Sequence, residues 1–365
     1  RVGLLTVVAF FMCACGGEEG LEFLEDEPYD VVVSDMRMPG MDGAAFLKKV
    51  YERYPETVRI VLSGHADDES SVKAGLVAHQ WLDKPCSQDE LVAALTRIEE
   101  GIERLPSLDV RQAVGKVSSL PTPSSTFLQI KDVISNDADA IGAVTDLIAE
   151  DPGLTAKVLQ LTNSSFFFRG NPVTEVKDAV VRLGLDVVVG VVMLAEVYMK
   201  APNADHFDTT KEQQHCLSVS RLVGEMFDSD LKKIAVMAGL LHDVGRYIIV
   251  QVFPEKLEEY TTALQDKTQH IYKVERSIFG TDHGQLAGYL LFLWGFSNDI
   301  IDAVVNHHLV DDASAESWSP AAAIYLANQL LRKNEIPDDL LQRLGVQDRI
   351  EGWRGLADEI TVDSE

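Results

Sequence analysis

The stretch VVVSDMRMPGMDG, residues 31–43, decides how the N-terminal part of this chain folds. Its three consecutive valines are typical of a short buried strand, which ends in Ser34 and Asp35. In open parallel sheets, the residues that carry chemistry collect at the carboxyl ends of the strands. The sequence therefore places Asp35 where a functional carboxylate is expected.

The residues that follow repeat this arrangement. Short apolar runs at 59–62 and 80–82 indicate two more strands, and Ser63 and Lys84 come just after them. Amphipathic stretches predict helices at 44–54, 70–78 and 89–102. Strands that alternate with helices form a parallel sheet, so Asp35, Ser63 and Lys84 are predicted to meet at one edge of an α/β domain. Solvated side chains at three strand ends are the alternative.

These residues resemble the receiver domain of two-component response regulators, which has a flavodoxin-like fold. Two further motifs support the resemblance, VLSGHAD at 61–67 and WLDKP at 81–85. The resemblance implies that Asp35 is the phospho-acceptor, Ser63 the switching hydroxyl, Lys84 the cation that pairs with the phosphoryl group and Trp81 the aromatic switch. It also implies a sensor histidine kinase as partner. The chemistry agrees, because a carboxylate that accepts a phosphoryl group needs a nearby cation to balance the charge.

One part of the receiver pattern is missing. In receivers, a pair of acidic residues after the first strand holds Mg²⁺. This pair lies further upstream than the residues available before Asp35. The first acidic residue in this sequence is Glu18. We therefore expect a receiver over 1–105 that is incomplete at its N-terminus, with Mg²⁺ bound only in an intact form. Without those carboxylates, Asp35 should accept a phosphoryl group poorly. The apolar run 2–12, just before Cys13 and Cys15, superficially resembles a lipoprotein signal but is too short to cross a bilayer.

Beyond residue 105 the pattern becomes almost wholly helical. A linker that leads into the second domain is expected over 106–125, where three prolines mark breaks. Apolar residues at three- and four-residue spacing predict helices at 126–135, 141–150, 154–161, 176–183, 187–197 and 321–332. An acidic and less ordered segment is expected over 331–365.

The histidines of this helical part are placed on several predicted helices. They are His215, His242 beside Asp243, His283, and the pair His307 and His308. Imidazole and carboxylate together suit divalent metal ions. A single histidine in such a setting is more often a core residue bonded to a carbonyl, but several on different helices favour a shared pocket.

The helical part resembles the HD superfamily of metal-dependent phosphohydrolases, and more closely its HDOD branch, over 112–330. The motifs that carry the resemblance are SSLPTPSSTFLQI (118–130), AEDPGLTAKVLQLTNSS (149–165), DAVVRLGLDVVV (178–189), AGLLHDVG (238–245), NHH (306–308) and AAIYLANQLL (322–331). HDOD domains resemble regulatory modules more than hydrolases. The resemblance thus implies an all-α HD-like output domain that contacts a downstream signalling protein.

The chain departs from active HD enzymes at the last metal position. The resemblance assigns the first three ligands to His215, His242 and Asp243, and the fourth falls at Asn328. A neutral amide oxygen is a weaker ligand than a carboxylate, so a divalent ion should bind weakly. His283, His307 and His308 are candidate pocket residues. The Gly-Tyr-Pro motif of cyclic-dinucleotide phosphodiesterases is absent after His308, and Arg246 stands where that group usually has lysine, so this activity is not expected.

Charge and cysteine content narrow the remaining choices. The chain has 58 acidic and 32 basic residues, a net charge of −26, and no basic cluster, so direct binding to nucleic acid or to an anionic membrane is disfavoured. The four cysteines form no CxxC pair, which is typical of reduced thiols in a cytoplasmic protein. We therefore expect a bacterial response regulator with a non-catalytic HDOD output. A metal-dependent phosphohydrolase is the alternative, and homodimerisation stays open.

Overall fold

The computed structural model of the protein describes residues 14–63, 78–104, 108–116, 125–136, 140–162, 173–199, 208–228, 231–266, 269–308 and 317–362. The chain divides into two compact units, Arg1–Leu95 and Thr96–Glu365. The first is α/β and the second all-helical, as the sequence predicts. The division falls inside the helix α4 (Gln88–Arg104). The apolar run 2–12 and nearly all of the helix predicted at 70–78 lie outside the described residues.

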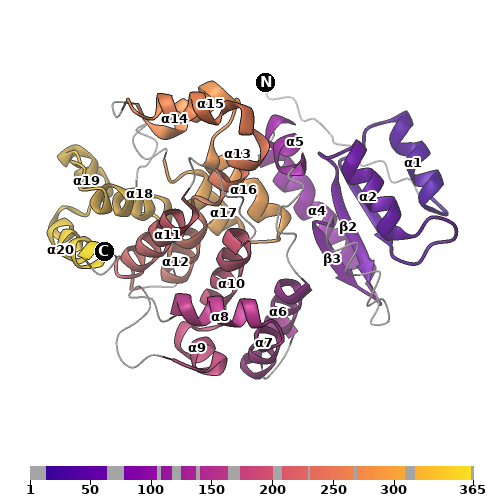
Figure 1. The fold of residues 1–365 in the computed structure, drawn as a ribbon, viewed down its shortest axis with the longest axis horizontal. Helices are drawn as coiled ribbons and strands as arrows, with labels where there is room; N and C mark the ends of the chain where they lie inside the picture. The colour runs from indigo at the N-terminus through magenta and orange to yellow at the C-terminus, as the bar shows by residue number, and fades with distance from the viewer. Residues whose placement is uncertain are drawn as a thin grey trace. The chain divides into compact units, whose positions relative to one another are not determined.

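The first unit is built on a parallel sheet. Its described strands are β1 (Val31–Asp35), β2 (Val58–Ser63) and β3 (Gln80–Asp83), in the order β1-β2-β3. The register sets Asp35 opposite Leu62 and Ser63 opposite Asp83, so the three strands end at the same edge. Two helices, α1 (Gly17–Asp26) and α2 (Gly43–Arg53), cover the sheet with a shared apolar core (Figure 1).

The start of α2 is pressed against the end of β1. Asp42 caps the helix by accepting a hydrogen bond from Ala45 N at 2.7 Å, and Gly43 N donates to Met36 O at 3.1 Å. A Cβ atom added at Gly43 would lie 2.1 Å from the carbonyl oxygen of Asp35. Only glycine therefore allows this close approach, which fixes the loop beside Asp35.

The second unit consists of helices packed around a central, largely apolar one. In chain order after α4, the α-helices are α5 (Leu108–Lys116), α6 (Ser125–Asn136), α7 (Ala140–Ala149), α8 (Pro152–Thr162), α9 (Val176–Leu183), α10 (Leu185–Met199), α11 (Thr209–Gly224), α12 (Leu231–Leu241), α13 (Val244–Val252), α14 (Leu257–Ala263), α15 (Ile271–Phe279), α16 (His283–Leu293), α17 (Asn298–Val305), α18 (Pro320–Leu331), α19 (Asp338–Leu344) and α20 (Ile350–Val362). Two short 3₁₀ turns, Pro254–Lys256 and Gln347–Arg349, precede α14 and α20.

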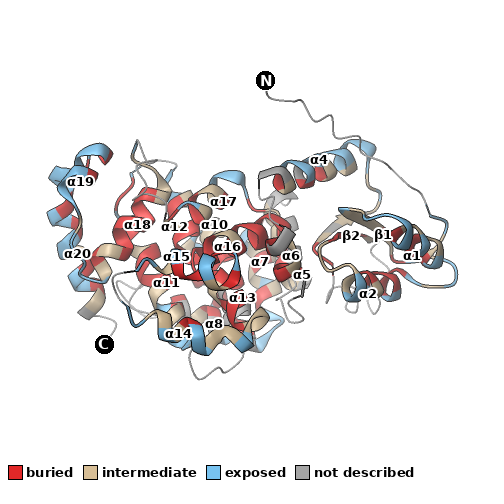
Figure 2. Cartoon of the chain, turned by 90° about the horizontal axis from the view of Figure 1, so that it is seen from above, coloured by how far each residue is buried: buried red, intermediate tan, exposed pale blue. Residues whose placement is uncertain are grey.

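The helix α16 lies at the centre of this unit, and all of its residues except Gln285 are buried (Figure 2). A helix that is apolar on every side is stable only inside a core. Its C-terminal end is held from α6, because Lys131 Nζ donates to the carbonyl oxygens of Trp294 at 2.7 Å and Gly295 at 2.9 Å. This pairing satisfies carbonyl groups that the end of a helix leaves free.

One helical stretch among the described residues, Leu231–Val252, has the length and hydropathy of a membrane-crossing helix. It comprises α12 and α13, and 83% of its 18-residue apolar window is buried inside the protein. Core helices meet the same criteria, so the stretch is weak evidence of a membrane span.

The C-terminal segment differs from the prediction. Instead of a less ordered acidic end, residues 338–362 form α19, a 3₁₀ turn and α20, and α20 packs on α11 and α18. The physical reason is a row of buried apolar residues that recurs at helical spacing between the exposed acids: Leu340, Leu341, Leu344, Val346, Ile350, Trp353, Ala357 and Ile360. Trp353 also stacks on Trp318, with ring centroids 5.2 Å apart.

The close approach at Gly43 yields a test. Gly43→Ala places a methyl group against the backbone of Asp35, so the first unit should lose about 1–3 kcal/mol of its free energy of unfolding. Urea unfolding followed by circular dichroism measures the loss. Gly352→Ala, where an added Cβ meets nothing within 4 Å, is the control and should be neutral or slightly stabilising. Equal stability of the Gly43→Ala variant and the wild type would contradict the packing.

Candidate functional site

The predicted receiver site is assembled at the edge of the sheet where the strands end. Asp35 is the last residue of β1, and Lys84 follows β3. Lys84 Nζ donates to Asp35 Oδ2, and both side chains are more than a third exposed. Arg37 N donates to Asp35 Oδ1 at 2.9 Å. The structure thus brings together the predicted acceptor and the predicted cation, open to solvent.

The carboxyl of Asp35 is held in its ionised form. Burial alone would raise its pKa, but the hydrogen bond from Lys84, the amides of Arg37 and Met36, and the charge of Lys84 outweigh burial and lower the pKa. An ionised carboxylate is the form that can act as a nucleophile. The side chains of Ser63 and Trp81 lie outside the described residues, so their predicted switch roles stay predictions.

A Mg²⁺ ion at the receiver stays a prediction for an intact form of this domain. The carboxylate of Glu18, the first acidic residue, accepts a hydrogen bond from Met41 N at 3.3 Å and supports the loop after β1. Asp35 already pairs with Lys84. Mg²⁺ usually keeps several waters and is held by one or two carboxylates together with phosphate oxygens, so Asp35 would supply only part of such a site.

The second candidate site lies inside the helical unit, where five helices meet. His215 lies within α11, His242 directly follows α12, Asp243 precedes α13, His283 begins α16, and His307 and His308 follow α17. A close crossing of α13 and α16 makes this possible. A Cβ atom added at Gly245 would lie 1.9 Å from the carbonyl oxygen of His283. Glycine at 245 therefore allows Asp243 and His283 to come together.

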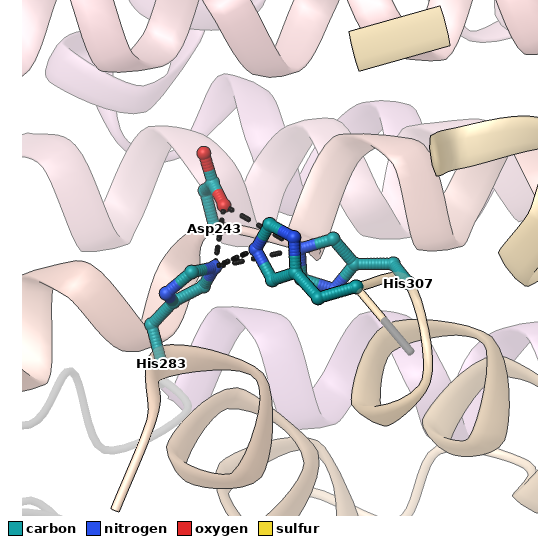
Figure 3. Close-up of side chains that lie close together, drawn as sticks. Asp243, His283 and His307 are labelled. Carbon is teal, nitrogen blue, oxygen red and sulfur yellow. Dashed lines mark hydrogen bonds and ion pairs between the residues drawn. The ribbon is translucent and has the colours of Figure 1, made fainter. Parts of the chain in front are cut away.

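Asp243 is the centre of this site, and its side chain is only 4% exposed. Its Oδ1 lies 3.2 Å from His283 Nε2 and 3.9 Å from His307 Nε2, and Figure 3 shows these side chains pointing toward one another. Its Oδ2 lies 3.4 Å from His242 Nε2 and 3.8 Å from His215 Nε2. The two oxygens of one carboxylate therefore face two different groups of imidazoles.

Hydrogen bonds from the ring Nδ1 atoms fix how these imidazoles are turned. The Nδ1 atom of His242 lies 2.8 Å from Gly239 O, that of His307 lies 2.6 Å from Val304 O, and that of His283 lies 2.5 Å from Glu275 Oε2. Such partners set the tautomer and direct Nε2 inward. The Nε2 atom of His308 lies 2.8 Å from His283 Nε2, and its ring stacks on Tyr272. Several ring nitrogens thus point at one small volume.

Burial and charge divide these imidazoles into neutral and protonated ones. Burial lowers the pKa of His215 and of His242 to about 4 and that of His307 to about 3, so these rings are neutral at physiological pH. Burial also acts on His283, but the carboxylates of Glu275 and Asp243 outweigh it and raise its pKa to about 10. A proton on His283 therefore offsets part of the charge of two buried carboxylates.

Sequence reasoning missed Glu275, which is fully buried and central to the site. Its carboxylate accepts hydrogen bonds from Tyr260 Oη at 2.6 Å and His283 N at 3.0 Å, in addition to the ring of His283. A signal was present, because Glu275 lies between Tyr272 and Phe279 on the apolar face of α15. An acidic residue on an apolar face requires a buried partner.

Asn328, the predicted weak fourth ligand, lies in α18 and is buried close to His215. Among the described residues, its Oδ1 and the Nε2 atoms of His215 and His242 are buried without a hydrogen-bond partner. Buried polar atoms are nearly always satisfied, so orphans of this kind fit ligation of a cation. The donor set fits a divalent transition metal, which accepts imidazole and carboxylate ligands together.

The comparisons with known proteins agree with both halves of the chain. The family model of the HDOD domain matches residues 120–310, and that of the response regulator receiver domain matches residues 8–96. The chain belongs to the HDOD family and carries a response regulator receiver domain in front of it. The two-component resemblance drawn from the sequence is confirmed.

Two curated relatives and one solved structure show the extent of the likeness. The DNA-binding transcriptional regulator NtrC of Escherichia coli is 43% identical over 82 residues, and the hydrogenase transcriptional regulatory protein HoxA of Cupriavidus necator is 39% identical over 87 residues. These matches cover 22% and 23% of this chain but only 18% of each relative. An HDOD domain protein with unknown function from Geobacter sulfurreducens shares the fold, with a TM-score of 0.53 and 23% identity, over 72% of this chain and 92% of that protein.

The buried Glu275–His283 pair provides a stability test. Glu275→Ala removes the partner of a buried charge and should cost about 3 kcal/mol of the free energy of unfolding. Glu275→Gln keeps an oxygen acceptor and should cost less. Glu259→Ala, an exposed glutamate of α14, is the control and should change stability by less than about 0.5 kcal/mol. Urea unfolding in the presence of a chelator measures all three, and equal losses for Glu275→Ala and Glu259→Ala would contradict the pairing.

Proposed function

We propose that the chain is a phosphorelay response regulator in which the receiver controls protein–protein binding by the HDOD unit. The observation that carries this proposal is the pair of Asp35 and Lys84 at the strand ends, on the same chain as an HDOD unit. A phosphoryl group on Asp35 would take Lys84 as its counter-ion, which changes the charge and the hydrogen bonding at that edge of the sheet.

The signal passes by a shift between two populations. A receiver with two conformations moves toward the one that holds the phosphoryl group better, and the HDOD unit reports that shift through its affinity for a partner. The tight contact between Gly43 and the Asp35 carbonyl supports this proposal, because a displacement of the Asp35 backbone would displace the start of α2 as well. Ser63 and Trp81 are the proposed switch residues.

The proposed setting follows from the same function. A sensor histidine kinase supplies the phosphoryl group, a downstream signalling protein reads the HDOD unit, and both act in the cytoplasm. The strongly negative net charge of −26 favours protein partners over nucleic acid and anionic membranes. A homodimer through the receiver is compatible with this proposal.

Phosphorylation of the purified chain tests the proposal. The protein is incubated with a small acyl phosphate and Mg²⁺, and phosphorylation is measured by intact mass. Phosphorylation of the wild type should be slow, because the Mg²⁺ ligands beside Asp35 are incomplete. Asp35→Asn should not be phosphorylated. Hydrogen exchange should then change in HDOD peptides of the labelled wild type and remain unchanged in Asp35→Asn treated in the same way. Labelling of Asp35→Asn, no labelling of either protein, or unchanged exchange in labelled wild type would contradict it.

A second candidate function is metal-dependent hydrolysis of a phosphoester. The orphaned Nε2 atoms of His215 and His242 beside Asp243 favour it. These residues would hold a divalent ion, which supplies an activated water and polarises the phosphoryl oxygens. The neutral Asn328 in place of a carboxylate speaks against efficient turnover.

Asn328→Asp distinguishes the two candidates. If the helical unit is a weakened hydrolase, this variant should hydrolyse bis(4-nitrophenyl) phosphate at least about tenfold faster than the wild type in the presence of Mn²⁺. His242→Ala in the same background should abolish that gain. No turnover by the wild type or by Asn328→Asp contradicts hydrolysis and leaves the signalling proposal in place.

A further inference from the structure

We propose that the helix α4 transmits the state of the receiver to the helical unit, and that it does so through the contact of Gly101 with Phe292 of α16. The inference rests on the proposed signalling function for the origin of the signal. The coupling itself is a property of the packing, and it is measured without phosphorylation.

The first argument is that α4 is one unbroken helix shared by the two units. Its residues 88–95 belong to the first unit and its residues 96–104 to the second. Sharp kinks in helices occur mostly at proline or at glycine and serine pairs, whereas Leu95 and Thr96 stand at this boundary. Each turn of the helix is hydrogen-bonded to the next, so a displacement at one end is passed along the axis.

The second argument is the position of the first turn of α4 relative to Lys84. Ser87 and Glu90 form a capping box. Glu90 Oε2 accepts hydrogen bonds from Ser87 N at 2.7 Å and from Ser87 Oγ at 2.8 Å, and Glu90 N donates to Ser87 Oγ at 3.2 Å. The box fixes the start of the helix shortly after Lys84, the counter-ion of Asp35. A displacement of Lys84 therefore reaches α4 through a very short segment of chain.

The third argument is the contact near the other end of α4, inside the second unit. A Cβ atom added at Gly101 would lie 1.9 Å from Cε2 of Phe292 and 2.3 Å from its Cζ. The Phe292 ring therefore lies directly against the backbone of α4, and both residues are buried. Glycine is unfavourable inside a helix, and this close approach explains its presence here. Ile98, one turn earlier, is fully buried as well, so this part of α4 is held in the core.

The fourth argument is that α16 carries a displacement from Phe292 to the buried site. Phe292 and His283 lie on the same helix, about two and a half turns apart. A Cβ atom added at Gly288, between them, would lie 2.2 Å from Val305 Cγ2, and one added at Gly245 would lie 1.9 Å from His283 O. Close-packed interiors transmit strain because they contain little free space to absorb it. A shift of α16 therefore moves His283 relative to its neighbours on α13 and α17.

Hydrogen exchange of the α16 amides tests this route in the full-length chain without phosphorylation. Lys84→Ala removes the counter-ion of Asp35 and should change the exchange rates of α16 peptides by at least about fivefold, the lower end of typical coupling between sites. Lys48→Ala, an exposed lysine of α2, is the control and should leave these rates unchanged. Peptides of α20 provide the reference for general stability and should exchange alike in all three proteins.

A break in α4 at the boundary of the two units should interrupt the coupling. Thr96 is exposed, so Thr96→Pro breaks the helix without removing a core side chain. In this background Lys84→Ala should change the α16 rates by less than about twofold, whereas in the Thr96→Ala background the full effect should remain. Thr96→Gly is the milder variant if Thr96→Pro does not fold, which circular dichroism and urea unfolding reveal.

The contact itself is tested by a compensating pair. Gly101→Ala pushes a methyl group into the Phe292 ring and should raise the α16 rates by at least about fivefold. Gly101→Ala combined with Phe292→Leu should return them toward the wild-type rates, because leucine leaves room for the methyl group. Gly355→Ala, where an added Cβ meets nothing within 4 Å, is the control.

Two outcomes would overturn the proposal: unchanged α16 exchange in Lys84→Ala, or an effect of Lys84→Ala that survives in Thr96→Pro. Failure of the phosphorelay gives a different result. Coupling that is present in a chain that accepts no phosphoryl group supports this route and contradicts only the proposed origin of the signal.

Discussion

The buried carboxylate of Asp243 is the constraint on which the helical unit depends. An isolated charge in an apolar core costs several kcal/mol unless it is paired and hydrogen-bonded. Here the compensation comes from five helices: His215 from α11, His242 next to α12, Arg246 from α13, His283 from α16 and His307 next to α17. These five helices are therefore held together at Asp243, and Gly245 allows α13 to approach α16 closely.

The two units handle charge in opposite ways. In the receiver, Asp35 is solvent-accessible and has Lys84 as its counter-ion, which suits its proposed role as phospho-acceptor. In the helical unit, Asp243 and Glu275 are buried, and the rings of His242 and His307 beside Asp243 are held in place by backbone carbonyls. The accessible site at Asp35 is suited to covalent modification, whereas the buried site at Asp243 is suited to holding a ligand that fits its fixed geometry.

The sequence predicted the fold well because its signals are local. The valine run at 31–33, the helical spacing at 176–183 and the apolar stretch at 187–197 correspond to β1, α9 and α10. The gathering of the histidines was also predictable in outline. Glu275 and the division of Asp243 between two groups were not, because they depend on how α15 and α16 pack, which no short motif encodes. The buried face of α20 was overlooked because Glu351, Asp358 and Glu359 interrupt its apolar residues along the sequence.

The C-terminal helices have a consequence for how the output unit can be isolated. The HDOD family match ends at residue 310, yet α18 and α20 pack on α11, and α18 brings Asn328 to the site. A fragment cut at the family boundary would uncover the apolar sides of α11 and α12 and would lack the stacked pair of Trp318 and Trp353 altogether. Exposed apolar patches of this kind drive association in dilute solution. The smallest fragment in which the apolar sides of α11 and α12 stay covered therefore extends to the end of α20, well past the boundary of the family match.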